Sequence, residues 1–331
     1  MGQIGRRQFL VVATMLVAVA PLGLRAQPGV RTARVGLLFA GTPSIVASYF
    51  EGVRSELRAL GWEEGRNLVF EKRYAEGHAD RFPALAAQLV GAGVDVIVAS
   101  TSQAVDATRA ATRSVPIVML GVPDPIAQGY VASYSRPGGN VTGLSNMQSR
   151  EIPLKQLELA LELLPGSKTM GILWSPENKG SADAFAYEQS KAEKSGLRVV
   201  SLAVSTPEQI DGALELALRE RIQFLRVHAT PAILVTIGEV ASWGAQHRVP
   251  TIGGLRAYAQ AGVLASYNPD YLDMWRGAAR FVDRILRGAK PAEMPIERPT
   301  KFLLVVNQKT AQRIGITIPQ SVLARADEVI Q

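Results

Sequence analysis

Short apolar runs alternate with amphipathic segments along most of the chain. The runs at 33–40, 94–100 and 115–120 are rich in Val, Ile and Leu, which predicts buried β-strands. Between them, apolar residues recur at helical spacing, as in 50–60, and such segments predict helices with one buried face. Buried strands in strand–helix–strand order are typical of parallel sheets that carry helices on both faces. The expected strands are 33–40, 68–74, 94–100, 115–120, 169–174, 197–204, 222–228, 249–252 and 302–306. The expected helices are 50–60, 82–90, 103–112, 151–164, 181–195, 207–219, 231–247, 271–286 and a last helix before Ile318 and Pro319.

The alternation breaks once, at 135–146. This segment (SRPGGNVTGLSN) is rich in Gly, Pro, Ser and Asn and has no periodic face, so we expect it to connect two separate units. The strand–helix pattern then restarts, and a chain of 331 residues is long enough for two domains. The sequence therefore predicts an α/β protein with two doubly wound parallel-sheet lobes.

The N-terminus has the three parts of a secretory signal peptide. Arg6 and Arg7 precede an apolar stretch, 9–20, and a short segment that ends at Ala26 follows. The apolar stretch is shorter than the roughly 20 residues that a membrane-spanning helix needs. We therefore expect residues 1–26 to be a signal peptide that is cleaved after Ala26.

The paired arginines are also similar to a twin-arginine export motif, because Phe9 and Leu10 follow them closely. An ordinary signal peptide with two arginines stays the alternative, since Gly5 and Val11 depart from that motif. The chain contains no cysteine, so it has neither a lipid-attachment residue nor disulfides. An exported protein without a membrane anchor is expected to be free in a periplasm.

Charge and motifs exclude several classes of function. The net charge of +7 includes three arginines of the predicted signal peptide, and no basic stripe carries interleaved aromatics, so we expect no nucleic-acid partner. His78, His228 and His247 show neither metal-ligand spacing nor an acidic partner in a shared motif. We therefore expect no catalytic residue, no metal and no cofactor. An exported α/β enzyme and a ligand-sensing periplasmic partner remain the alternatives.

A ligand of such a fold binds beyond the carboxyl ends of the strands, where loops lead into helices. There the first helical N–H groups lack partners within the helix and favour an anion. Ser100, Thr101 and Ser102 follow the strand at 94–100 and form the best candidate cradle for a carboxylate. The alternative is that one of these hydroxyls only caps the following helix.

Other strand ends supply further candidates. Asp124 is expected either to receive a ligand ammonium or to shape its turn, and Glu177 with Asn178 offers a polar pair on the second lobe. Trp174 and Tyr267 lie at strand ends where they can stack on an aromatic ligand or belong to the core. The complete set of expected ligand-binding residues is Thr42, Ser100, Thr101, Ser102, Gln103, Asp124, Asn146, Trp174, Glu177, Asn178, Thr230, Gly253 and Tyr267.

Five ordered segments of the chain carry a family resemblance. They are 60–77, 95–104, 124–145, 288–302 and 307–330, and the most distinctive are RPGGNVTG within 124–145 and the closing GITIP with its ARADEVI tail. The chain resembles the tryptophan/tyrosine-type ABC transporter substrate-binding family, which has the type I periplasmic-binding fold.

The resemblance implies two lobes joined by three crossings, near 143–146, 265–268 and 298–301. Lobe one would comprise 27–143 plus 268–298, and lobe two 146–265 plus 301–331. It also implies a monomer without a membrane anchor that captures a small molecule for the membrane permease of an ABC transporter.

The expected ligand is an aromatic or branched amino acid or a related carboxylate. Many members of the family carry an acidic residue after the strand that corresponds to 222–228, and Thr230 stands there in this chain. This departure weakens the expectation of an α-amino acid and leaves room for a carboxylate that lacks the amine.

Overall fold

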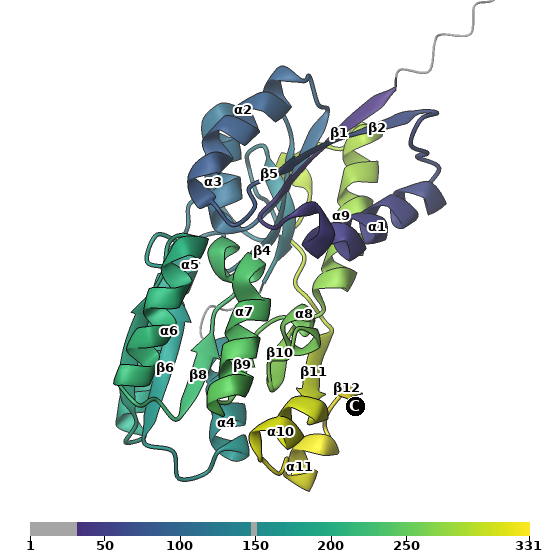
Figure 1. The fold of residues 1–331 in the computed structure, drawn as a ribbon. Helices are drawn as coiled ribbons and strands as arrows, with labels where there is room; N and C mark the ends of the chain where they lie inside the picture. The colour runs from purple at the N-terminus through teal and green to yellow at the C-terminus, as the bar shows by residue number, and fades with distance from the viewer. Residues whose placement is uncertain (1–31, 147–150) are drawn as a thin grey trace, which may run out of the picture. The chain divides into compact units, whose positions relative to one another are not determined.

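The computed structural model describes residues 32–146 and 151–331 (Figure 1), and the predicted signal peptide, 1–26, lies outside them. Within these ranges no helix is long and apolar enough to cross a membrane. The strands are β1 (Ala33–Phe39), β2 (Leu68–Tyr74), β3 (Val96–Ser100), β4 (Ile117–Val122), β5 (Val141–Ser145), β6 (Thr169–Trp174), β7 (Arg198–Ala203), β8 (Phe224–Val227), β9 (Thr251–Gly253), β10 (Ala265–Pro269), β11 (Phe302–Asn307) and β12 (Glu328–Ile330). The α-helices are α1 (Pro43–Ala59), α2 (Phe82–Gly91), α3 (Ser102–Ala111), α4 (Glu151–Leu163), α5 (Lys179–Lys194), α6 (Ile210–Arg219), α7 (Pro231–His247), α8 (Arg256–Gln260), α9 (Tyr271–Leu286), α10 (Gln308–Ile314) and α11 (Gln320–Leu323).

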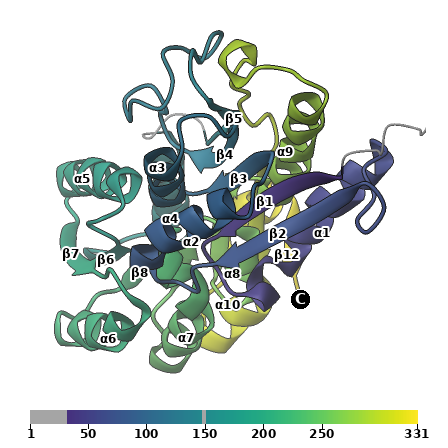
Figure 2. The same cartoon turned by 90° about the horizontal axis from the view of Figure 1, so that it is seen from above.

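The first lobe is built on a five-stranded sheet with the order β2-β1-β3-β4-β5, and all of its neighbouring strands are parallel. Side chains alternate between its two faces: Val96 and Val98 pack in the cluster with α1 and α9, whereas Ile97 and Ala99 pack in the cluster with α2 and α3. Figure 2 shows these two helix pairs on opposite sides of the strands. Two covered faces explain why the strands are apolar throughout.

Helix α9 belongs to this lobe although it follows β10 of the other lobe in the sequence. Asp270 caps it by accepting hydrogen bonds from the N–H groups of Leu272 and Asp273, at 3.1 and 3.2 Å. Its apolar face is buried in the cluster with α1, and Trp275 is only 2% exposed. The strong amphipathic pattern at 271–286 therefore reflects packing against the first sheet.

The second lobe is built on a seven-stranded sheet with the order β12-β11-β10-β9-β8-β6-β7. The face that packs with α6, α7 and α8 forms one apolar cluster, and α4, α10 and α11 contribute to the cluster on the other face. Figure 1 shows α6 and α7 running along this sheet. The chain thus forms two parallel-sheet lobes of α/β type, as the sequence predicts.

Strand β11 departs from the parallel arrangement. It pairs antiparallel with β10, with Pro269 opposite Phe302, because the chain enters the second lobe again from the side of α9. The apolar strand pattern predicts parallel sheets throughout, and the antiparallel pair of β10 and β11 corrects this prediction.

The chain passes between the sheets after β5, after β10 and before β11, and the passing segments are hydrogen-bonded to one another. The N–H of Ser145 donates to the carbonyl of Glu297 at 2.9 Å, and the N–H of Asp270 donates to the carbonyl of Lys301 at 3.0 Å. These contacts make the three segments neighbours. The lobe limits given by the sequence analysis stay a prediction.

The segment 135–146 is not wholly irregular. It contains β5, whose Gly143 has a φ of 127° and would place a Cβ only 2.3 Å from the carbonyl oxygen of Met119. Only glycine fits this close approach of two strands. Part of the Gly-rich segment that was expected to connect the two units is therefore the edge strand β5.

The other differences concern short or terminal elements. The expected strand 249–252 begins two residues later, at Thr251, and the helix expected at 207–219 begins with a 3₁₀ turn, Pro207–Gln209, before α6. Strands β10 and β12 and helices α8 and α11 were not predicted. Elements of three to five residues are too short to show a period of 2 or 3.6.

Candidate functional site

A cavity of about 180 Å³ lies between the two lobes, lined by residues of both. A buried water needs roughly 10–15 Å³, so the cavity has room for a small organic molecule. Its first-lobe wall includes the end of β3 and the start of α3, and its second-lobe wall includes the starts of α5 and α7. It lies where the carboxyl ends of strands meet loops, the position that parallel sheets favour for ligands.

Three helices begin at this cavity. Ser102 begins α3, Gly180 and Ser181 lie in the first turn of α5, and Pro231 begins α7, and all four residues line the wall. The first N–H groups of a helix have no partner within the helix, and the helix dipole adds positive potential there. The polar part of the cavity therefore favours a negatively charged group.

Two residues with hydroxyl side chains, Thr101 and Ser102, lie at the start of α3 and make different contacts. Thr101 caps the helix, because its Oγ1 accepts a hydrogen bond from the N–H of Ala104 at 3.2 Å. Its φ of 137° is rare for a residue with a side chain and holds the loop in a strained conformation. Ser102 is buried, and its carbonyl accepts a hydrogen bond from the hydroxyl of Tyr130 at 3.1 Å. The capping role thus falls to Thr101, and ligand contact by the hydroxyl of Ser102 stays a prediction.

Aromatic side chains form an apolar wall of the same cavity. Tyr49 of α1 stacks on Trp275 of α9, with ring centroids 6.0 Å apart and planes 13° apart. Tyr258 and Tyr271 complete the wall. Burial, with the nearby Asp270 carboxylate, raises the pKa of Tyr49 to about 12, so its hydroxyl stays neutral at physiological pH. A wall of neutral aromatic rings suits a flat apolar group.

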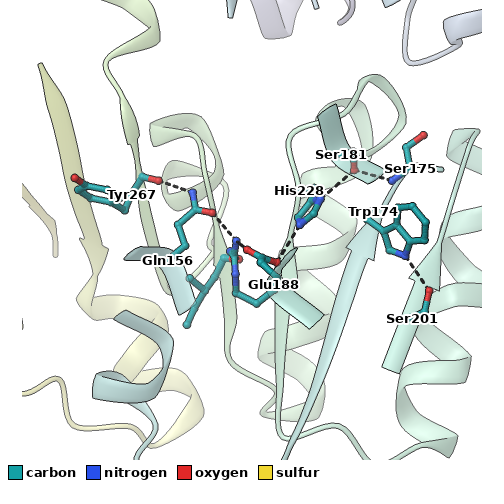
Figure 3. A network of polar contacts seen from close by, with 10 residues as sticks. Gln156, Trp174, Ser175, Ser181, Glu188, Ser201, His228 and Tyr267 are labelled. Atoms are coloured by element: carbon teal, nitrogen blue, oxygen red, sulfur yellow. Dashed lines mark hydrogen bonds and ion pairs between the residues drawn. The ribbon is translucent and has the colours of Figure 1, made fainter. Parts of the chain in front are cut away.

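A buried polar cluster supports the second-lobe wall (Figure 3). Glu188 of α5 accepts hydrogen bonds from Arg226 at 2.8 Å and from His228, whose Nε2 lies 3.1 Å away. On the other side of its ring, Nδ1 of His228 lies 3.0 Å from the hydroxyl of Ser181, next to the start of α5. Gln156 connects Arg226 to the carbonyl of Tyr267 on β10. The cluster therefore joins α4, α5, β8 and β10.

The charges of this cluster balance internally. Burial raises the pKa of Glu188, but the charges and hydrogen bonds of Arg226 and His228 lower it more strongly, to about 2. The carboxylate is therefore ionised at neutral pH and paired with Arg226. Both side chains are at most 1% exposed, and removing one partner of such a pair leaves an uncompensated buried charge.

The sequence of contacts from Ser181 through His228 to Glu188 is similar to that of a nucleophile-activating triad. Here, however, Arg226 takes one oxygen of the carboxylate, and the backbone N–H of Ser175 donates to the hydroxyl of Ser181 at 3.0 Å. The hydroxyl is thereby held within the loop that starts α5. The arrangement orients the cavity-facing end of α5.

Three buried polar atoms in the cavity wall have no hydrogen-bond partner among the described residues. Oγ1 of Thr230, at the N-cap of α7, is unpaired although the residue is only 2% exposed. Oδ1 of Asn268, in a residue 7% exposed, and Oδ1 of Asn146 are also unpaired. Buried polar groups normally have partners, so all three atoms are candidates for ligand contact.

The structure brings six of the predicted ligand-binding residues to the cavity wall. They come from both lobes and are Ser100, Thr101, Ser102, Asn146, Asn178 and Thr230. Ligand contact by each of them stays a prediction, although the geometry places them together.

The other predicted residues do not line the cavity. Thr42 caps α1, and the carboxylate of Asp124 accepts the N–H of Ala127 and shapes its own turn. Trp174 stacks on Phe185, with ring centroids 4.1 Å apart. The remaining residues are Gln103, which binds Asn178, Glu177, which is exposed, Gly253, which packs on Tyr258, and Tyr267, which stacks on Phe302.

Several wall residues were not predicted from the sequence. Tyr49 and Trp275 lie on helices whose apolar faces also form the core, so periodicity alone does not separate the two roles. Glu188 and His228 are 40 residues apart, and no local motif connects them. Among the described residues no group of three or more His, Asp or Glu side chains lies together as a metal site.

Comparison with known proteins gives a consistent result. Residues 38–330 match a family model described as "ABC transporter substrate binding protein". The chain is 25% identical over 266 residues to a tyrosine-binding protein of Clostridioides difficile, covering 80% of this chain and 76% of that protein.

The solved structures that are similar to this fold include the following two. One is an ABC domain from Streptococcus pneumoniae in complex with L-Trp, with a TM-score of 0.82, 29% identity and coverage of 90% of this chain and 100% of that one. The other is a conserved domain protein from Vibrio cholerae, with a TM-score of 0.83, 28% identity and the same coverage.

Proposed function

The chain belongs to the family of ABC transporter substrate-binding proteins, and from this premise we propose that it captures a small aromatic carboxylate for import. The ligand class comprises an aromatic amino acid or a related aromatic acid. Such a component binds its solute between the two lobes and delivers it to a membrane permease. We propose that it works as a monomer and catalyses no reaction.

The observation that carries the ligand class is the composition of the cavity wall. Four aromatic residues, Tyr49, Tyr258, Tyr271 and Trp275, form one part of the wall, and the starts of α3, α5 and α7 form another. A ring fits the first part through stacking and burial of apolar area. A carboxylate fits the second part through free N–H groups, hydroxyls and the helix dipoles.

The similar proteins support the same class. One relative is named as a tyrosine-binding protein, and a structural neighbour of 29% identity was solved with L-Trp. Both names describe an aromatic side chain joined to a carboxylate. The aromatic wall of this cavity agrees with that ligand chemistry, while a branched aliphatic ligand would leave the rings without a stacking partner.

Capture is proposed to involve closure of the two lobes about the three crossing segments. The lobes already contact one another at Asn178 and Gln103, and Gly180 lies against Pro123 of the first lobe. A ligand that binds both walls favours the state in which the lobes are together. In this proposal, the lobes move relative to each other at the crossing segments that the family resemblance implies.

Export to the periplasm is part of the proposal and rests on the sequence of residues 1–26. Fusion of residues 1–30 to a reporter that folds in the cytosol should give a periplasmic signal. The double change Arg6→Lys with Arg7→Lys should abolish that signal if the twin-arginine route is used. Export that survives the double change would indicate the general secretory route.

A thermal-shift screen of the purified mature chain tests the ligand class. A ligand at a hundred times its dissociation constant stabilises the folded state by about 2.7 kcal/mol, which shifts the melting temperature by several degrees. Aromatic amino and carboxylic acids should give this shift, while aliphatic acids and aromatic amines without a carboxylate should not. Stabilisation by the aromatic amines alone would contradict the proposal.

A further inference from the structure

The negative charge available inside the cavity limits which aromatic carboxylate it accepts. Glu188 is the one acidic residue among the described residues of the wall. Its two oxygens are occupied, Oε1 by Arg226 at 2.8 Å and Oε2 by His228 at 3.1 Å. Because Arg226 already balances its charge, Glu188 has no charge to offer a ligand cation.

Three aspartates adjacent in sequence to wall residues are also engaged elsewhere. Asp124 accepts the backbone N–H of Ala127 at 3.0 Å. Asp183 forms an ion pair with Lys179 at 3.4 Å. Asp270 caps α9 and forms an ion pair with Lys301 at 2.8 Å. None of the three lines the cavity, so none offers a negative charge to a ligand cation.

The remaining polar groups of the wall favour a negative or neutral ligand group. The starts of α3, α5 and α7 direct N–H groups and positive potential toward the cavity. The unpaired hydroxyl of Thr230 and the amide of Asn268 are neutral and bind an uncharged oxygen as readily as a carboxylate. A buried ammonium without a carboxylate partner is strongly disfavoured.

We infer that the ligand is an aromatic carboxylate without an α-ammonium group, that is, an aromatic 2-oxo acid, 2-hydroxy acid or unsubstituted aryl-alkanoate. This inference rests on the proposed function and narrows its ligand class. Thr230 is then the residue that sets the specificity, because it occupies the N-cap of α7 with a neutral hydroxyl that lines the cavity and has no partner within 32–146 and 151–331.

The test compares matched ligand pairs by titration calorimetry on the mature wild-type chain. One series is L-phenylalanine, phenylpyruvate, phenyllactate and 3-phenylpropionate, and the other is L-tryptophan with its indole 2-oxo, 2-hydroxy and propionate counterparts. We expect at least one acid without the ammonium to bind ten times or more tighter than the amino acid of its series. An amino acid that binds equally well or better overturns the inference and leaves the proposed function standing.

The variant Thr230→Asp provides the reciprocal test. It places a carboxylate at the cavity and should fold, since aspartate is as good an N-cap as threonine. We expect it to reverse the preference toward the amino acid, whereas the neutral control Thr230→Asn keeps the wild-type order. Preserved order in Thr230→Asp, with an unchanged melting temperature, contradicts the role of Thr230. Binding of neither ligand series by the wild type contradicts the proposed function itself and the inference with it.

Discussion

The side-chain amide of Asn178 donates a hydrogen bond of 2.7 Å to Oε1 of Gln103, across the cleft between the lobes. The same Asn178 caps α5, because its Oδ1 accepts the N–H of Ser181 at 2.9 Å. Asn178 thus has two roles: it caps α5, which begins at the cavity, and it forms a hydrogen bond between the two lobes. His78 and Glu208, 3.5 Å apart, make a second polar contact between the lobes.

The change Asn178→Asp separates the two roles. The aspartate keeps the cap but loses the amide donor to Gln103, so the closed state loses one hydrogen bond worth roughly 0.5–1.5 kcal/mol. We expect ligand affinity to fall about two- to tenfold, with little change in the melting temperature of the ligand-free protein. Gln103→Ala removes the same bond from the other side, and the double variant should lose no more affinity than either single one. Additive losses would show that the bond is not the common cause.

The start of α3 gives a matched pair of hydroxyl variants. Ser102→Ala should weaken ligand binding about ten- to a hundredfold, because a hydrogen bond to a charged group contributes roughly 1.5–3 kcal/mol. Thr101→Ala removes the cap of α3 and should instead lower the unfolding free energy by about 1 kcal/mol. Calorimetry and melts of the ligand-free proteins measure both effects. If Ser102→Ala leaves the dissociation constant unchanged, the hydroxyl of Ser102 does not bind the ligand carboxylate.

Tryptophan fluorescence distinguishes the aromatic wall from the core. Among the tryptophans, Trp275 lines the cavity and Trp174 does not. Ligand binding should therefore change the emission of the wild type and of Trp174→Phe, and leave that of Trp275→Phe almost unchanged. If Trp174→Phe loses the ligand-induced change in emission, Trp174 contacts the ligand, as its position at a strand end predicts.

Glu188 and Arg226 form a buried ion pair in the second lobe. Glu188→Gln leaves Arg226 buried without a counter-charge and should lower the unfolding free energy by about 3–5 kcal/mol. The control Glu162→Gln breaks the exposed ion pair with Arg325 and should change it by less than about 1 kcal/mol. Urea unfolding of the three proteins at pH 7 measures the difference, and equal effects would contradict the account of the buried pair.

The pH dependence of this pair follows from the lowered pKa of Glu188. Since the folded pKa is about 2 and the unfolded value is near 4.5, the stabilisation is fully present above about pH 5 and is lost as the pH falls toward 2. The stability difference between wild type and Glu188→Gln should therefore shrink across this interval. A difference that stays constant from pH 6 to pH 3 would show that the carboxylate is not paired in its ionised form.

The fold was predictable because buried strands and amphipathic helices leave periodic patterns, and such patterns cover most of the chain. The short strands β10 and β12 leave no such pattern, and the antiparallel pairing of β10 with β11 depends on the path of α9 through the other lobe. Likewise, the position of the loop residues Ser100, Ser102 and Asn178 at the cavity was predictable, because cavities of parallel sheets form beyond the carboxyl ends of their strands.

The remainder of the wall was not predictable from one sequence. The positions of Tyr49 and Trp275 on their helices satisfy the core and the cavity equally well. The partners Glu188, Arg226 and His228 come from two separate elements, and only the folded lobe brings them within hydrogen-bond distance. Trp174 was placed at the site because it ends a strand, but its ring packs on Phe185.

The most direct test of the account is titration calorimetry of aromatic carboxylates on the wild type and on a variant whose cavity is filled. Ala184 of α5 lines the cavity, and Ala184→Trp should occupy the space that the ring of a ligand needs. The account predicts one-site binding with a negative heat-capacity change for the wild type and no measurable binding for Ala184→Trp, with both proteins folded by circular dichroism. Equal affinity of the two proteins, or no binding of any aromatic carboxylate to the wild type, would contradict it.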